Sequence, residues 1–173
     1  MKPILAGFVL AMAALTPAFG QTVHGIEARQ QAVVAAWQQT PLSVRRAMLV
    51  AVEAPLFGDY DARPTDKFQS GEPIIEYVEP VGYTWKPAED GKVQFGVVVD
   101  LVVKTPGGKI LGGKEHFIRY KAVSHARVQE LMLNMTVHLN GLPPGDYILT
   151  FVIHDINDPT RTSSVDQPIT IAA

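Results

Sequence analysis

The chain has 173 residues with a formal net charge of −2 at pH 7, and it contains no cysteine. Its basic residues are interspersed with acidic ones, so it lacks the clustered positive charge by which proteins bind nucleic acids or anionic lipids. The absence of cysteine excludes disulfide bonds, thiol catalysis and attachment of a lipid through a cysteine.

The N-terminal stretch MKPILAGFVLAMAALTPAFG has the layout of a secretory signal peptide. It carries one lysine, an apolar run from Ile4 to Leu15, and small residues that end with Gly20. A membrane anchor is the alternative, but spanning a bilayer requires about 20 apolar residues, more than this run provides. We therefore expect residues 1–20 to be removed as a signal peptide. The mature chain would begin at Gln21 and be periplasmic or secreted, with no stable membrane anchor.

Residues 21–67 are predicted to form a helical segment followed by a loop. In GIEARQQAVVAAWQQ, apolar residues recur at the spacing of one helix face, among them Ile26, Val33 and Trp37. A second helix is predicted over 41–53, because a threonine that can cap a helix precedes a proline suited to the first helical position. The two together would make a pair of short α-helices.

From residue 68 onward, apolar and polar residues alternate with the period of β-strands. Turns rich in Gly and Pro separate the alternating segments at short intervals. The predicted strand segments are 73–79, 82–87, 93–104, 109–121, 130–139, 146–155 and 163–171. The predicted fold class is therefore mainly β: a seven-stranded antiparallel β-sandwich over 68–173, preceded by the N-terminal pair of short α-helices.

The segment LPPGDY bears a resemblance to a known class of domains. Leu142, Gly145 and Tyr147 resemble the leucine, proline-glycine, tyrosine element at the penultimate strand of immunoglobulin-like (Ig-like) and fibronectin-like sandwiches. In those folds the tyrosine packs inward and its hydroxyl bonds to backbone a few residues upstream. Residues 68–173 thus resemble exported bacterial Ig-like or fibronectin-like β-sandwich domains of unknown function. The resemblance implies a structural corner at these three residues and is silent on activity.

The histidines do not predict a metal site. In a hairpin closed symmetrically by 140–146, His138 and His154 lie about 20 Å apart at roughly 3.3 Å per residue, too far to share one ion. Asp155 and Asp158 follow His154 and could join it around a cation. An Asn-Asp-Pro turn after a strand is the more economical interpretation of these residues, so we expect them to be scaffold.

Two further pairings fail because alternate residues of a strand point to opposite faces. Met132 and His138 would share one face while Met135 lies on the other, so a soft-metal site is not predicted. Glu76 and Glu79 likewise point to opposite faces, which argues against paired acid/base catalysis. The sequence predicts no catalytic residue, no metal ligand and no cofactor.

The segment EYVEPVGYTWKP is the strongest candidate for a binding site. Tyr77, Tyr83 and Trp85 flank a Pro/Gly turn, and Tyr83 and Trp85 can stand on one face near a loop tip. Exposed aromatic rings there would form a platform for a sugar ring, a peptide or another protein. The alternative is that Tyr77 and Trp85 are core anchors of the sandwich.

These features together indicate an exported, noncatalytic binding or cell-envelope accessory module. Its expected partner is a protein, peptide or glycan whose identity the sequence does not specify. The alternative is a periplasmic hydrolase or metal-handling protein that uses His, Asp and Glu residues from loops.

Overall fold

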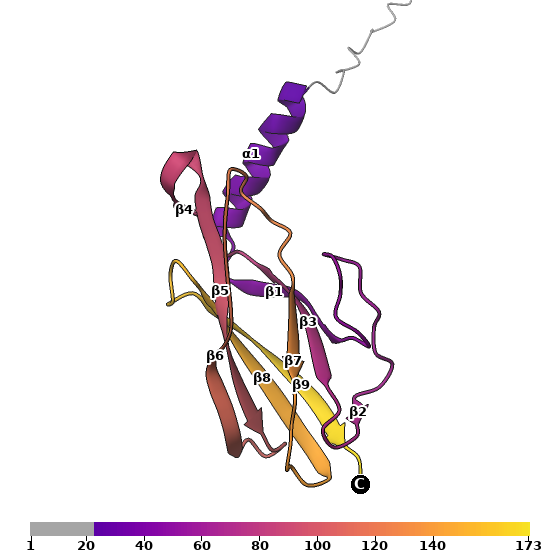
Figure 1. Ribbon diagram of the computed structural model, residues 1–173. Coiled ribbons are helices and arrows are strands. Elements are labelled where there is room, and N and C mark those ends of the chain that lie inside the picture. The colour runs from indigo at the N-terminus through magenta and orange to yellow at the C-terminus, as the bar shows by residue number, and fades with distance from the viewer. Residues whose placement is uncertain (1–22) are drawn as a thin grey trace, which may run out of the picture.

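A computed structural model describes residues 23–173 of the chain (Figure 1). The predicted signal peptide and the predicted mature terminus at Gln21 lie outside the described residues. In chain order the elements are α1 (Val23–Gln39), β1 (Ser43–Leu49), β2 (Lys67–Phe68), β3 (Ile74–Val81), β4 (Lys86–Pro87), the 3-10 helix η1 (Glu89–Gly91), β5 (Val93–Lys104), β6 (Ile110–Ser124), β7 (Leu133–Val137), β8 (Gly145–Asp155) and β9 (Thr162–Ile171). Between residues 23 and 173, no helix combines the length and the apolar character that a membrane crossing requires.

The strands form two sheets. The smaller sheet has the order β1-β3-β7, and the larger has the order β2-β9-β8-β5-β4, with β6 pairing on the other side of β5. Every pairing is antiparallel except the short one between β2 and β9. The mainly β fold class is confirmed, and each predicted strand segment overlaps a strand of the structure.

Both sheets contribute side chains to one hydrophobic core. On β5 and β8 every second residue points inward, because side chains alternate between the two faces of a sheet. The inward residues of the central strands are Phe95, Val97, Val99, Leu101 and Val103 on β5, and Tyr147, Leu149, Phe151 and Ile153 on β8. Facing them are Ile74 and Val78 on β3, and Leu133, Met135 and Val137 on β7. The alternation of apolar and polar residues in the sequence therefore identifies the residues of these strands that face the core.

The predicted second helix over 41–53 is wrong, because this segment contains strand β1, which pairs with β3. The register shifts between Val44 and Arg46, so a bulge inserts an extra residue into β1. Val44, Ala47 and Leu49 all pack on the core, and the bulge gives the first two a helix-like spacing. Pairing with β3 outweighs local helix propensity. One helix, α1, therefore precedes the strands in the described part of the chain, and the predicted helical segment supplies a strand to the smaller sheet.

A second, smaller apolar cluster covers the outer face of the smaller sheet, where Val50 and Tyr77 are buried. The Tyr77 hydroxyl donates to Glu79 at 2.8 Å and accepts from the backbone N–H of Gly58 at 2.9 Å. Arg45 binds the same Glu79 carboxylate at 2.8 Å. The loop after β1 thereby covers this face of the sheet.

Candidate ligand-binding cleft

Trp37, in the last turn of α1, attaches the helix to the strands. Its ring is stacked on Trp85 with centroids 5.4 Å apart, and it meets Tyr83 edge to face at 5.0 Å. Its indole N–H donates to the carbonyl of Tyr83 at 2.8 Å. Aromatic pairs of this geometry stabilise beyond the area that they bury. These contacts therefore fix the C-terminal end of the helix.

The rest of α1 is exposed. No residue of the helix is buried, and Ile26 and Val33 expose 52% and 51% of their surface. Figure 1 shows the helix extending away from the ends of the strands. The predicted apolar stripe of the helix therefore packs against the strands at its Trp37 end and is open to solvent at the other end.

The turn that follows α1 is held closely against the end of β3. Gly82 has φ +75°, and a Cβ atom there would lie 2.3 Å from the carbonyl oxygen of Pro41, so a larger residue would clash. Arg161 donates from Nη2 to the carbonyls of Thr40 at 2.7 Å and Gly82 at 2.8 Å. These contacts set the direction in which α1 leaves the strands.

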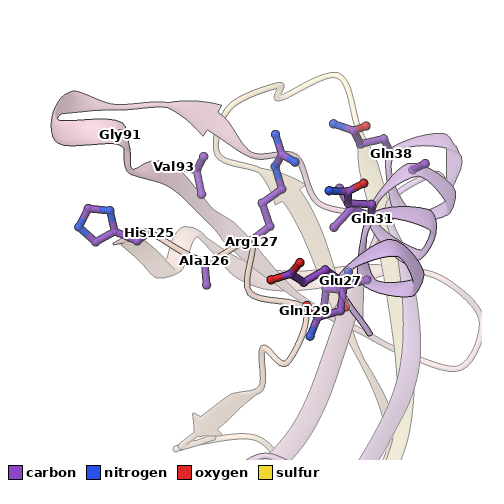
Figure 2. Close-up of a pocket in the computed structure, with 12 residues that line it drawn as sticks. Glu27, Gln31, Gln38, Gly91, Val93, His125, Ala126, Arg127 and Gln129 are labelled. Carbon is purple, nitrogen blue, oxygen red and sulfur yellow. The ribbon is translucent and has the colours of Figure 1, made fainter. Parts of the chain in front are cut away.

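A cleft of about 730 Å³ lies between α1 and the strands. One wall belongs to α1, and the other belongs to the start of β5 and to residues 125–129, which follow β6 (Figure 2). The lining residues are Glu27, Gln30, Gln31, Val34, Ala35 and Gln38 from the helix, and Gly91, Val93, His125, Ala126, Arg127 and Gln129 from the opposite side. We call this space the α1 cleft.

Amide side chains and one arginine dominate the polar lining of the α1 cleft. Within residues 23–173, the side chains of Arg127 and of the four lining glutamines form no hydrogen bond or ion pair. Glu27, on the helix wall, has a carboxylate oxygen 3.3 Å from the ring of His24. A carboxamide both donates and accepts, and a guanidinium donates. The cleft can therefore pair with the N–H and C=O groups of another chain.

The predicted aromatic platform does not lie on the surface. Tyr77 and Tyr83 expose 0% and 1% of their surface, and they belong to different apolar clusters. Trp85 is half-buried, because its ring packs on Trp37 and its indole N–H donates to the carbonyl of Val128 at 3.1 Å. The three side chains are packing anchors, and they do not offer a shared face to a ligand.

His154 and Asp155 are adjacent in sequence but have separate roles. Asp155 is buried and accepts hydrogen bonds from the backbone N–H of Thr84 at 2.6 Å and of Asn157 at 2.8 Å, so it holds the loop after β8. His154 points to the opposite face of the sheet, where its Nε2 lies 3.0 Å from Oδ2 of Asp100. Asp155 therefore has a structural role. His154 has a carboxylate partner, Asp100, that could not be identified from the sequence.

The other residue pairs considered from the sequence are separated. Glu76 is buried and has no hydrogen-bond partner among residues 23–173, whereas Glu79 is bound by Arg45 on the opposite face of β3. Met135 lies in the main core, and Met132 packs on the smaller cluster. Within residues 23–173, no three His, Cys, Asp or Glu side chains are grouped so that they could hold a metal ion.

Tyr147, near the start of β8, is buried, and its hydroxyl donates to the carbonyl of Pro143 at 2.7 Å. Leu142 packs against the main core from the preceding loop. Gly145 begins the strand with φ +153°, a conformation that favours glycine. The bond from the Tyr147 hydroxyl to backbone four residues upstream is the contact that the resemblance implies for this tyrosine.

Sequence reasoning missed the α1 cleft. Its walls come from segments far apart in the chain, and glutamines on a helix have the pattern of an ordinary solvated face. No protein-family model matches this chain, and no curated protein matches it. The functional argument therefore depends on the geometry.

Proposed function

We propose that this chain is an exported, noncatalytic binding or cell-envelope accessory module that holds a peptide segment of a client protein in the α1 cleft. The observation that carries the proposal is the unpaired polar lining of the cleft: four glutamines and Arg127 without partners in residues 23–173. The volume of about 730 Å³ lies within the range of ligand pockets, roughly 300–1,000 Å³.

An Ig-like β-sandwich is the scaffold that we propose for this module. The order of the longer strands supports it. Apart from the two-residue strands β2 and β4, the chain passes from β1 and β3 in the smaller sheet to β5 and β6 in the larger, returns with β7, and ends with β8 and β9 in the larger. The bond from the Tyr147 hydroxyl to Pro143 supports it as well. Sandwiches of this class commonly present binding surfaces at their ends, and α1 leaves the strands at one end (Figure 1).

A peptide suits the cleft better than a glycan. Sugar rings are commonly bound on exposed aromatic faces, and here Trp37, Tyr83 and Trp85 pack on one another. Carboxamides and a guanidinium instead match the donors and acceptors of a peptide backbone. The apolar side chains of α1 that line the cleft, Val34 and Ala35, can contact apolar side chains of the same peptide.

Selection of random displayed peptides on the folded mature protein tests this proposal. Selected peptides should bind the double variant Gln31→Ala/Arg127→Ala at least about 10-fold more weakly, because each lost hydrogen bond contributes about 0.5–1.5 kcal/mol, and more with a charged donor. Arg29→Ala is the matched control, since Arg29 is on α1 but does not line the cleft. Equal affinity for the double variant and the control would contradict the proposal.

Export is tested separately from binding. When the gene is expressed with residues 1–20, the protein should be recovered from the periplasm or medium with an intact mass that starts at Gln21. Recovery of the unprocessed chain from a membrane fraction would contradict export.

A further inference from the structure

The outer face of the larger sheet carries a second, smaller pocket of about 340 Å³ that shares no lining residue with the α1 cleft. Strand register explains why its residues meet. Val98 on β5 lies opposite His154 on β8 and opposite Arg119 on β6, so the three form one row across the sheet. We call this space the His154 pocket.

Asp100 organises the histidines of the His154 pocket. Its Oδ2 lies 3.0 Å from Nε2 of His154, and its Oδ1 accepts a hydrogen bond from the backbone N–H of His116 at 2.7 Å. A carboxylate only accepts, so Nε2 of His154 carries a hydrogen in this pair. The other ring nitrogen, Nδ1, is therefore not used by Asp100.

His116 has an unusual backbone conformation that brings it to this pocket. The register of β5 with β6 jumps at Asp100, and the bulge gives His116 a φ of +51°. Positive φ is uncommon outside glycine, and such strain tends to occur where a functional site requires it. Bulges are also enriched beside binding and catalytic sites, where they redirect a side chain.

The charged donor that remains available in the His154 pocket is Arg119. Both oxygens of Asp100 are used as described, and Asp155 is saturated by Thr84 and Asn157. Arg119 lines the pocket, is exposed, and forms no hydrogen bond or ion pair within residues 23–173. An incoming ligand therefore meets a free guanidinium and two imidazole rings.

The floor of the pocket is apolar. Val98 is only 8% exposed although it lies on the outer face, and Ile156 and Pro159 line the same space. We propose that the His154 pocket binds a small organic oxyanion. Arg119 and His116 would hold its carboxylate or phosphate group, and its apolar part would lie on Val98. This site is independent of the peptide-binding function proposed for the α1 cleft.

Calorimetric titration of the mature protein with benzoate and with phenyl phosphate tests the inference and distinguishes a carboxylate from a phosphate head group. At least one of them should bind saturably, and Arg119→Gln should weaken that binding about 10-fold or more, because a charge-assisted pair is lost. Arg29→Gln, which removes an arginine outside the pocket, should bind like the wild type.

Three outcomes would overturn the inference. One is the absence of saturable binding for both probes to wild-type protein whose folding is verified by circular dichroism. Another is equal affinity of wild-type protein and Arg119→Gln. The third is inorganic phosphate binding as tightly as phenyl phosphate, together with no binding of benzoate, since the apolar floor would then contribute nothing.

Discussion

Among single residues, Tyr147 of the segment LPPGDY shows how a short sequence motif can predict a specific hydrogen bond. Its ring fills a place in the main core, and its hydroxyl donates to the carbonyl of Pro143 four positions upstream. The hydrogen bond satisfies a polar group that would otherwise be buried without a partner. The loop before β8 is thereby fixed to the strand that it enters.

We expect Tyr147→Phe to lower the free energy of unfolding by about 0.5–1.5 kcal/mol, the contribution of one hydrogen bond. Tyr147→Ala should lower it by about 3–5 kcal/mol, because a buried ring is lost as well. Chemical denaturation followed by fluorescence measures both. Tyr120→Phe is the control, since Tyr120 is exposed and forms no hydrogen bond within residues 23–173, and it should be nearly neutral. A neutral Tyr147→Ala would show that the side chain is exposed in solution.

At the scale of elements, α1 depends on its last turn. The helix has 17 residues, a length at which an isolated helix is marginal in water. No acidic residue lies in its first turn and no basic residue in its last, so charges do not complement its dipole. Its order therefore depends on Trp37 and on the Arg161 contacts with the turn that follows.

Trp37→Ala should uncouple α1 from the strands. The loss of two aromatic contacts and one hydrogen bond should lower stability by roughly 2 kcal/mol, less than for a fully buried tryptophan. Hydrogen exchange should show faster exchange of α1 amides than in the wild type, with β5 and β8 still protected. Val33→Ala, at an exposed position of the same helix, should leave exchange unchanged. Equal protection of α1 in both variants would show that Trp37 is not its anchor.

At the scale of the whole molecule, Glu76 is a carboxyl group between two apolar core residues of β3, Ile74 and Val78. It is completely buried, and neither of its oxygens has a hydrogen-bond partner within residues 23–173. Burial raises its pKa from 4.5 to about 8. The folded protein therefore keeps this group protonated at neutral pH, which links global stability to pH.

Stability should fall as the pH rises from about 4.5 to about 8. In this window the unfolded chain releases the Glu76 proton while the folded chain retains it, so the free energy of unfolding should drop by roughly 1 kcal/mol per pH unit. Below the window both states are protonated, and above it both are ionised, so the contribution levels off. Denaturation at pH values of about 5 and about 8 measures the effect.

Glu76→Leu should remove this pH dependence and stabilise the protein at the higher pH, because an apolar side chain of similar size replaces an unpaired acid. Glu130→Leu, at an exposed position, should retain the dependence of the wild type. The same slope in Glu76→Leu and in the wild type would assign the pH dependence to other groups.

Local sequence patterns predict β3 and each strand from β4 to β9, as well as an inward-facing Tyr147, but they do not predict β1 or β2. The alternation of apolar and polar residues in a strand, and the turn formed by LPPGDY, depend on residues that are close together in the sequence. They can therefore be recognised without knowing which strands pair. The helix α1 was recognisable for the same reason, from the spacing of Ile26, Val33 and Trp37.

Which of these residues meet depends on long-range packing, which local patterns do not predict. The sequence pattern of 41–53 predicts a helix, whereas the segment forms β1, because the bulge of β1 exists only in its pairing with β3. The sequence leaves open whether Tyr83 and Trp85 are exposed or packed, because the ring that covers them, Trp37, lies on a helix far away in the chain. The α1 cleft and the pair of His154 with Asp100 likewise depend on register between segments that no local pattern relates. The periodicity of apolar residues depends on the local sequence, whereas the burial of a side chain and its neighbours in space depend on how distant segments pack.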